Sequence, residues 1–135
     1  KVQLLNREQV INQMMIVSES DLHGTITYAN EALCRISKYT QEELIGQGHN
    51  IFRHPEVPKA LFKLMWETLK AGQSFRGVVK NRAKDGSVYW VDAFICPGRN
   101  EKNEIDKYIS TRYHITDTAF AEKRYNEQNK ALGLA

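Results

Sequence analysis

Side chains that can carry charge and form hydrogen bonds are concentrated between residues 47 and 93. This stretch places Arg53 and His54 just before a segment with helical periodicity, and Asn81 within a strand-like run that follows. A guanidinium forks onto phosphate or carboxylate, an imidazole titrates near neutral pH, and a carboxamide both donates and accepts. Such side chains, with aromatic residues between them, predict the polar part of a ligand pocket.

Each of these three residues also has a purely structural interpretation. Asn81 could make a cross-strand hydrogen bond, and Arg53 could form a surface ion pair with Glu56. His54 could contact a ligand, ligate haem or brace its own loop. His49, in the same loop, is a weaker candidate for ligand contact. The residues alone leave these alternatives open.

Aromatic residues of the same stretch extend the candidate site. Trp66 belongs to the apolar stripe of the helical segment, so it is either a core residue or a platform for a ligand. Tyr89 and Trp90 are neighbours in a strand-like run, and neighbouring side chains of a strand point to opposite faces. Trp66 and Trp90 are both candidate binding residues, but only one of Tyr89 and Trp90 can face the pocket. The register of the sheet decides which.

Periodicity and capping signals predict the elements that hold these residues. We expect helices at 1–14, at 31–37, after Thr40, at 58–71 and from 118 to about 132. We expect strands at 15–20, 25–29, 75–81, 87–96 and 105–116. Hairpins at both ends with helices between them predict an α+β fold, in which a five-stranded antiparallel sheet carries helices on one face. A cavity between the sheet and the longer helix would then hold the candidate residues.

The composition is that of an ordinary globular domain. The chain of 135 residues has room for one core, and its net charge of +3 gives no argument for nucleic acid. No run of about 18 apolar residues is present, so we expect no membrane contact in this segment. Cys34 and Cys96 are far apart, which argues against a disulfide framework or a zinc site and favours a reducing cytoplasm. Because the chain begins without Met, we take it for a segment of a longer protein.

No pattern typical of an enzyme is visible in the sequence. A Ser-His-Asp set, a phosphate-binding glycine-rich loop and a pair of catalytic carboxylates are all missing. We therefore expect a binding domain rather than an enzyme. We place this domain at 15–117, with a flanking N-terminal helix at 1–14 and a C-terminal helix or linker at 118–135.

Several motifs resemble those of a PAS domain. They are YAN at 28–30, YTQEELIG at 39–46 and the closing IT at 115–116, and the resemblance covers about residues 16–117. Within this superfamily, HNIFRHPEVPKALFKLMW followed by GVVKNRAKDGSVYWVDA resembles the flavin-binding PAS domain of bacterial aerotaxis receptors. The same segments are similar to PAS domains of methyl-accepting chemotaxis proteins.

The resemblance implies a sensory domain that binds FAD non-covalently and reports redox or oxygen status to a signalling module of the same longer chain. Matched residue by residue, it implies positions near FAD for Asn30, Arg53, His54 and Asn81. Two further candidates depart from the family pattern: Glu56 stands where the family has Asp, and Phe75 where it has Trp. Each keeps the charge or the ring of the residue that it replaces. We expect the domain in the cytoplasm, alone or as part of a membrane-anchored receptor.

Two alternatives stay open beside an FAD sensor. The same fold could bind haem or another small molecule, or it could be a ligand-free dimerisation module whose end helices do the work. We expect a homodimer formed through the flanking helices. A light sensor that forms a covalent bond from cysteine to flavin is not expected, because residues 47–57 contain no Cys.

Overall fold

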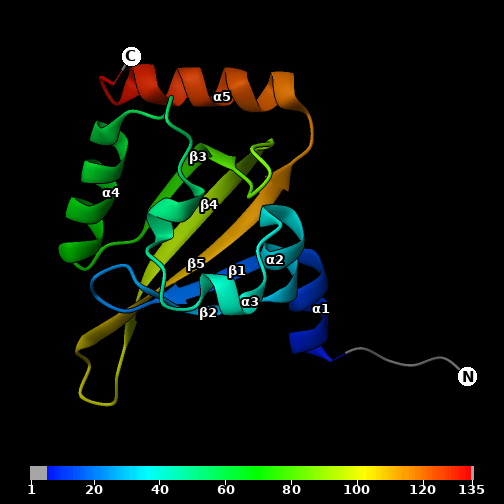
Figure 1. The fold of residues 1–135 in the computed structure, drawn as a ribbon. Coiled ribbons are helices and arrows are strands. Elements are labelled where there is room, and N and C mark those ends of the chain that lie inside the picture. The colour runs from blue at the N-terminus through cyan, green and yellow to red at the C-terminus, as the bar shows by residue number, and fades with distance from the viewer. Residues whose placement is uncertain (1–5, 135) are drawn as a thin grey trace, which may run out of the picture.

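The computed structural model describes residues 6–134 and has the predicted α+β architecture (Figure 1). In this part of the chain the helices are α1 (Arg7–Met14), α2 (Glu31–Ser37), α3 (Gln41–Leu44), the 3-10 helix η1 (His49–Phe52), α4 (Lys59–Lys70) and α5 (Thr118–Ala131). The strands are β1 (Ile16–Ser20), β2 (Ile26–Ala29), β3 (Phe75–Arg82), β4 (Val88–Arg99) and β5 (Ile105–Ile115).

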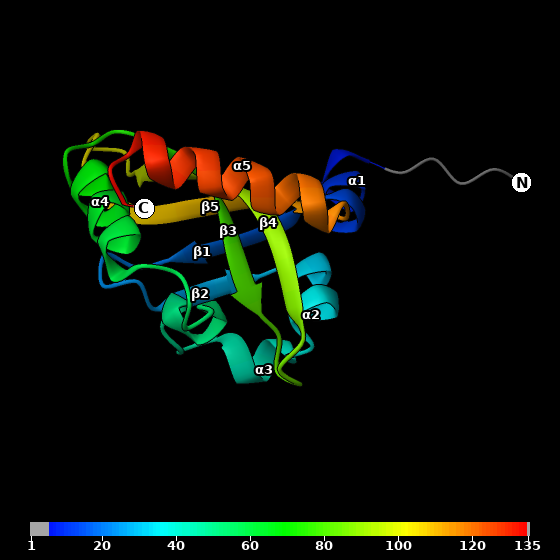
Figure 2. The same cartoon turned by 90° about the horizontal axis from the view of Figure 1, so that it is seen from above.

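The five strands found within residues 6–134 form one antiparallel sheet in the order β2-β1-β5-β4-β3. The N-terminal hairpin therefore joins the C-terminal strands through β1 and β5, where Ser18 lies opposite Ser110. Figure 2 shows α5 on one side of this sheet and α2 and α3 on the other. We call the α2 and α3 side the inner face and the α5 side the outer face. The predicted five-stranded antiparallel sheet is confirmed.

Local signals in the sequence explain where several elements begin and turn. Asn30 caps α2, because its side chain accepts a hydrogen bond of 3.0 Å from the Leu33 amide. Thr40 and Glu43 form the predicted capping box at the start of α3. Gly24, in the turn between β1 and β2, has a φ of +83°, a conformation that favours glycine.

The structure differs from the predicted elements mainly at their ends. Residues 49–52, expected as loop, form η1, and β4 continues to Arg99 rather than ending at 96. The predicted helix 58–71 is present as Lys59–Lys70. The N-terminal helix begins at Arg7, and residues 1–5 of its predicted range lie outside the described residues.

Apolar side chains pack on both faces of the sheet. Leu33 and Leu44 of the short helices, each at most 1% exposed, fill the inner face near β2 and β4. Leu61 and Leu69 bury one side of α4 against the same face. Ala121 of α5 is fully buried on the outer face. Burying a side chain as large as leucine contributes about 1.5–3 kcal/mol, so α4 has a fixed position beside the sheet. Among residues 6–134 no helix is long and apolar enough to span a bilayer.

Candidate ligand-binding site

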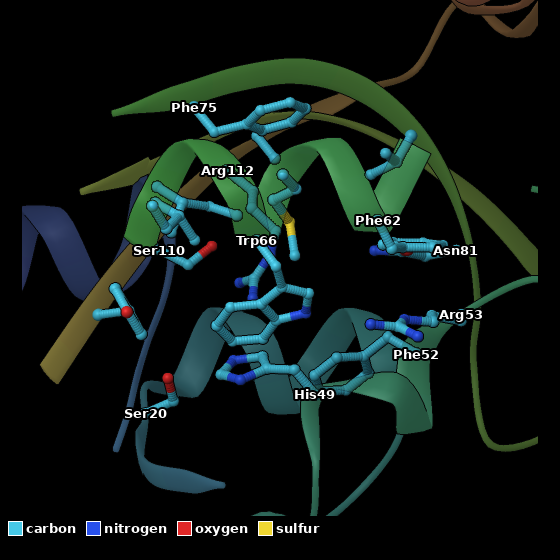
Figure 3. Close-up of a pocket in the computed structure, with 16 residues that line it drawn as sticks. Ser20, His49, Phe52, Arg53, Phe62, Trp66, Phe75, Asn81, Ser110 and Arg112 are labelled. Atoms are coloured by element: carbon cyan, nitrogen blue, oxygen red, sulfur yellow. The ribbon is translucent and has the colours of Figure 1, made fainter. Parts of the chain in front are cut away.

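A cavity of about 90 Å³ lies between α4, η1 and the inner face of the sheet (Figure 3). One water molecule needs roughly 10–15 Å³ by this measure, so the space exceeds that of a single solvent molecule. Five aromatic side chains form much of the wall: Phe52, Phe62, Trp66, Phe75 and Tyr108. The polar side chains at the wall are Ser20, His49, Arg53, Asn81, Ser110 and Arg112. The cavity is therefore mostly apolar and aromatic, with a few polar groups, as is typical of cofactor sites.

Helical spacing places one side of α4 on the cavity. Phe62, Met65, Trp66 and Leu69 all line it, and these positions differ by three, four and seven residues. The Trp66 ring packs edge-on against the Tyr108 ring, with centroids 5.5 Å apart. Trp66 is thus both part of the core and part of the cavity wall.

Strand alternation places the other polar groups. Asn81 in β3, and Ser110 and Arg112 in β5, all point to the inner face. The register pairs Asn81 with Tyr89, so Tyr89 is on the inner face and its neighbour Trp90 is on the outer face. The Trp90 ring there contacts the Tyr125 ring of α5, with centroids 5.2 Å apart.

A hydrogen-bonded chain runs along one end of the cavity. Nη2 of Arg112 donates to Oγ of Ser18 over 2.8 Å, and the same Oγ lies 2.8 Å from Nε2 of His49. Because a guanidinium only donates, the Ser18 hydroxyl accepts from Arg112 and gives its own proton to His49. His49 then carries its proton on Nδ1, which lies 3.4 Å from the Gly24 carbonyl oxygen. Burial and the nearby charge of Arg112 lower the pKa of His49 to about 4, so the ring is neutral.

Three buried polar atoms find no hydrogen-bond partner within residues 6–134: Nη1 of Arg112, Oγ of Ser110 and the Tyr89 hydroxyl. Buried polar groups in folded proteins are nearly always paired. Burial lowers the pKa of the Arg112 guanidinium to about 10 and raises the pKa of Tyr89 to about 12. Arg112 therefore stays charged and Tyr89 stays neutral near pH 7. Arg112 and Ser110 offer unused hydrogen-bonding groups at the cavity wall.

Arg53 lies at the wall beside Asn81. Its guanidinium carbon is 3.9 Å from the centre of the Phe62 ring, a cation–π contact. The backbones of Arg53 and Asn81 form an isolated antiparallel bridge, which connects the loop after η1 to the edge of β3. The ion pair considered between Arg53 and Glu56 is not the one found. Glu56 instead pairs with Lys80, with Oε2 and Nζ 2.9 Å apart.

Half of the eight candidate residues line the cavity: Arg53, Trp66, Phe75 and Asn81. Asn30 is absent from the described wall, and its side chain instead makes hydrogen bonds at the start of α2. Its Oδ1 accepts from the amides of Val17 and Leu33, and its Nδ2 donates to the Met15 carbonyl.

The other three candidates also lie away from the described wall of the cavity. His54 braces its loop, because its Nδ1 accepts a hydrogen bond of 3.1 Å from the Glu56 amide. The Glu56 side chain is exposed and paired with Lys80. Trp90 faces α5 because strand alternation turns it to the outer face. The structure thus places His54, Glu56 and Trp90 apart from the described wall, and their contact with a cofactor stays a prediction.

The site also includes residues that the sequence reasoning missed. Tyr108, Ser110 and Arg112 line the cavity, and none of them was a candidate. Their spacing of two along a predicted strand is a signal that they share a face, and a charged residue on a buried face is unusual. His49, considered only a weak candidate, also lines the cavity.

A family model described as PAS fold matches residues 26–112 of this chain. The chain belongs to the PAS-fold family. The aerotaxis receptor of Escherichia coli (strain K12) is 46% identical over 106 residues, which is 78% of this chain and 21% of that protein. The nitrogen fixation regulatory protein of Klebsiella pneumoniae is 33% identical over 108 residues, 80% of this chain and 22% of that protein. The chain thus spans about a fifth of the length of these two relatives.

Solved structures agree with this PAS fold. A light-oxygen-voltage domain studied with a flavin analogue superposes with a TM-score of 0.75 at 22% identity, covering 90% of this chain and 91% of that one. The PAS domain of a protein from Colwellia psychrerythraea has a TM-score of 0.73 at 20% identity, covering 82% and 94% of the two chains. At these identities the likeness concerns the fold. The PAS resemblance and the relation to aerotaxis receptors drawn from the sequence are confirmed.

Proposed function

We propose that this PAS domain is the sensory part of a longer signal-transduction protein of the chemotaxis or aerotaxis type, and that its cavity binds FAD non-covalently and senses redox or oxygen status. The observation that supports this most directly is the buried Arg112. Its Nη1 lies unpaired, within the described chain, at the wall of an aromatic cavity. The identity to an aerotaxis receptor supports the same class of protein.

The residues at the wall fit the isoalloxazine ring of a flavin. This ring is flat and aromatic, with carbonyl oxygens and ring nitrogens along its edges, and when bound it supplies one- and two-electron transfer. Trp66, Phe52 and Tyr108 offer apolar surfaces for the faces of such a ring. Arg112 and Ser110 can donate to its edge, and the Asn81 carboxamide can both donate and accept.

The charges at the wall favour an electron-rich ligand. Arg53 and Arg112 are positive, and none of the described wall residues is Asp or Glu. A buried guanidinium without an anionic partner is destabilising, so negative charge placed near Arg112 is stabilised. Arg112 would in this way stabilise the negative charge that a bound flavin gains on reduction.

Asn81 is well placed to pass a change in the cavity to α5. It belongs to the edge strand β3, and three residues earlier Gln128 of α5 binds the backbone of Val78. Gln128 accepts from the Val78 amide over 2.7 Å and donates to its carbonyl over 3.0 Å. A shift of β3 would therefore move the contact between the strand and the C-terminal helix.

Haem is less well supported as the cofactor. Of the histidines in residues 6–134, only His49 lines the cavity. Both of its ring nitrogens are engaged, Nε2 with Ser18 and Nδ1 with the Gly24 carbonyl. Ligation of iron would break this chain of hydrogen bonds.

A role as a dimerisation module is a second candidate that is compatible with the first. Met14 at the end of α1 is 74% exposed, and Phe120 in the first turn of α5 is 54% exposed. These apolar side chains on the two flanking helices are surfaces that a second copy could cover. Sedimentation velocity of the chain and of its Phe120→Lys variant measures this role separately from cofactor binding.

The absorption spectrum of the chain, refolded with FAD and freed of excess ligand, tests the main proposal. We expect the two visible bands of a bound oxidised flavin at one flavin per chain. Refolding with haemin, which would produce a sharp Soret band if haem were the ligand, is the parallel test. A folded but colourless protein after both treatments would contradict the proposal and favour the ligand-free dimerisation role.

A further inference from the structure

The two tryptophans of the chain occupy opposite faces of the sheet. Trp66 lies at the cavity wall, whereas Trp90 is 6% exposed beneath α5 and is not among the described wall residues. The Trp66 ring is packed against Tyr108, which also lines the cavity. The cavity thus has an indole and a phenol in contact with each other at its wall.

Trp66 has little freedom to move away from this position. A Cβ atom added at Gly24 would lie 3.1 Å from the Trp66 ring, so the β1–β2 turn closes tightly on the indole. The Tyr108 ring holds it from another side, at 74° to the indole plane. Because the cavity measures only about 90 Å³, a ring system inside it is in contact with its wall.

We propose that Trp66, with Tyr108 beside it, is an electron donor to a photoexcited flavin in this cavity, which gives the domain a light-driven reduction in addition to its redox response. This inference rests on the proposed binding of a flavin. Indole and phenol are the most easily oxidised aromatic side chains in proteins, and flavins accept single electrons. Thus the same residues that cover the ligand would determine what happens to absorbed light.

The electron and the proton in this step are accounted for as follows. The indole of Trp66 would donate one electron to the excited oxidised flavin, and the oxidised indole would release its Nε1 proton to solvent. In the absence of another reductant the electron and proton return, and the absorbed light is lost as heat. When a thiol in solution supplies one electron and one proton to the indole, the thiol is oxidised and the flavin remains reduced by one electron. Trp66 is only partly buried, so solvent can reach it.

The chain has no cysteine at the described cavity wall that could compete for the excited state. Cys34 belongs to α2 and lines a different groove, together with Asn30 and Arg35. Cys96 follows Ile95, whose side chain is at the wall, so strand alternation turns Cys96 to the outer face. Electron transfer from an aromatic side chain is therefore the route that the wall provides.

Time-resolved fluorescence of the bound flavin tests the inference, with Trp66→Phe compared with its matched control Trp90→Phe. We expect the flavin of the wild-type chain and of Trp90→Phe to be strongly quenched. Trp66→Phe should have a flavin lifetime several-fold longer, and Trp66→Phe/Tyr108→Phe a lifetime longer still. Under blue light with dithiothreitol, the rate of flavin reduction should fall several-fold in the same two variants.

The absorption spectrum separates the two ways in which this experiment can fail. A protein that takes up no flavin contradicts the proposed function, and the inference falls with it. A wild-type chain that holds one flavin with the lifetime of free flavin overturns the inference alone. Equal quenching of the flavin fluorescence in Trp66→Phe/Tyr108→Phe and in the wild type also overturns the inference alone. If Trp66→Phe fails to bind flavin, the flavin lifetimes of the wild type and of Tyr108→Phe still test the inference. A longer lifetime in Tyr108→Phe than in the wild type supports the donor pair. A wild-type lifetime equal to that of free flavin overturns the inference.

Discussion

The guanidinium of Arg112 donates a hydrogen bond of 2.8 Å to the hydroxyl of Ser18, and this contact determines the protonation of the cavity's polar end. The Ser18 proton must then go to His49, which is held neutral with its Nδ1 proton near the Gly24 carbonyl. The hydrogen bond to Ser18 anchors Nη2 of Arg112, whereas Nη1 has no partner in the described structure. A buried charge is thus positioned firmly but paired incompletely, which is expected of a group kept for a ligand.

Replacing Arg112 should separate stability from ligand binding. In the flavin-free protein, Arg112→Met removes a buried charge that has no acidic partner, so the free energy of unfolding should be unchanged or higher by about 1 kcal/mol. A hydrogen bond to a charged group contributes about 1.5–3 kcal/mol, so the Kd for FAD should rise roughly 10- to 100-fold. Urea unfolding and flavin titration measure the two effects. Arg82→Met, at an exposed arginine of β3, is the control. Strong destabilisation of the flavin-free Arg112→Met protein would show that Arg112 is a structural residue.

The neutral state of His49 should make stability depend on pH. Its pKa is about 4 in the folded protein and 6.5 in the unfolded chain, so between these values the unfolded chain binds the extra proton. Stability is therefore complete above about pH 6.5 and falls as the pH drops towards 4, by up to about 3 kcal/mol in total.

Urea unfolding of the wild type and of His49→Gln at pH 7 and pH 4.5 measures this contribution. Carboxylates also titrate in this range, so the relevant quantity is the difference between the two proteins rather than either curve alone. We expect the variant to lose less stability than the wild type on acidification. His114→Gln, at an exposed histidine of β5, should behave like the wild type. Equal losses in all three proteins would contradict the assigned role of His49.

Gly24 and Gly86 provide a matched test of the packing around Trp66. Both have positive φ, +83° and +88°, so alanine at either position costs about 1–2 kcal/mol in backbone conformation. Only at Gly24 would the new Cβ meet another group, the Trp66 ring at 3.1 Å; at Gly86 no described atom lies within 4 Å. Overpacking typically costs a further 1–3 kcal/mol. Gly24→Ala should therefore unfold at lower urea than Gly86→Ala, and should shift the tryptophan emission. Equal midpoints would mean that Trp66 moves freely.

Asn81 should be needed for flavin retention but not for folding. Its carboxamide lies at the wall and is 7% exposed, so Asn81→Ala removes a hydrogen-bonding group from the site without leaving a large void. We expect loss of about 1–3 kcal/mol of binding free energy. Gel filtration followed by the ratio of visible to ultraviolet absorbance measures it. Asn126→Ala, at an exposed position of α5, should retain one flavin per chain. Full occupancy in Asn81→Ala would remove this residue from the site.

Gln128 should hold α5 to the edge of the sheet. In Gln128→Ala the amide and carbonyl of Val78 lose their side-chain partner, at a cost of about 1–2 kcal/mol. Hydrogen exchange at the Val78 amide should accelerate by about tenfold or more, while FAD binding is preserved. Gln73→Ala, at an exposed glutamine after α4, should leave this exchange unchanged. Unaltered protection of Val78 in Gln128→Ala would exclude Gln128 as the link between β3 and α5.

Much of the fold depends on interactions between near neighbours, and these could be predicted from the sequence. The capping box of Thr40 and Glu43 spans three residues, and the turn at Gly24 depends on that residue's own φ. The period-two pattern of β3 and the helical stripe of α4 likewise follow from side-chain spacing. For this reason the element order, the sheet and the candidates Asn81 and Trp66 at the cavity wall could be anticipated.

What the sequence by itself determined is therefore local: which segments are helices or strands, and which residues share a face of each. The tertiary structure alone decided which face meets the cavity and which distant residues meet there. Trp90 turned to the outer face because the register pairs Asn81 with Tyr89. Arg112 became part of the site because β1 and β5 pair, bringing it to Ser18 across 94 residues. Such contacts depend on the pairing of strands far apart in the chain, which no short sequence pattern encodes.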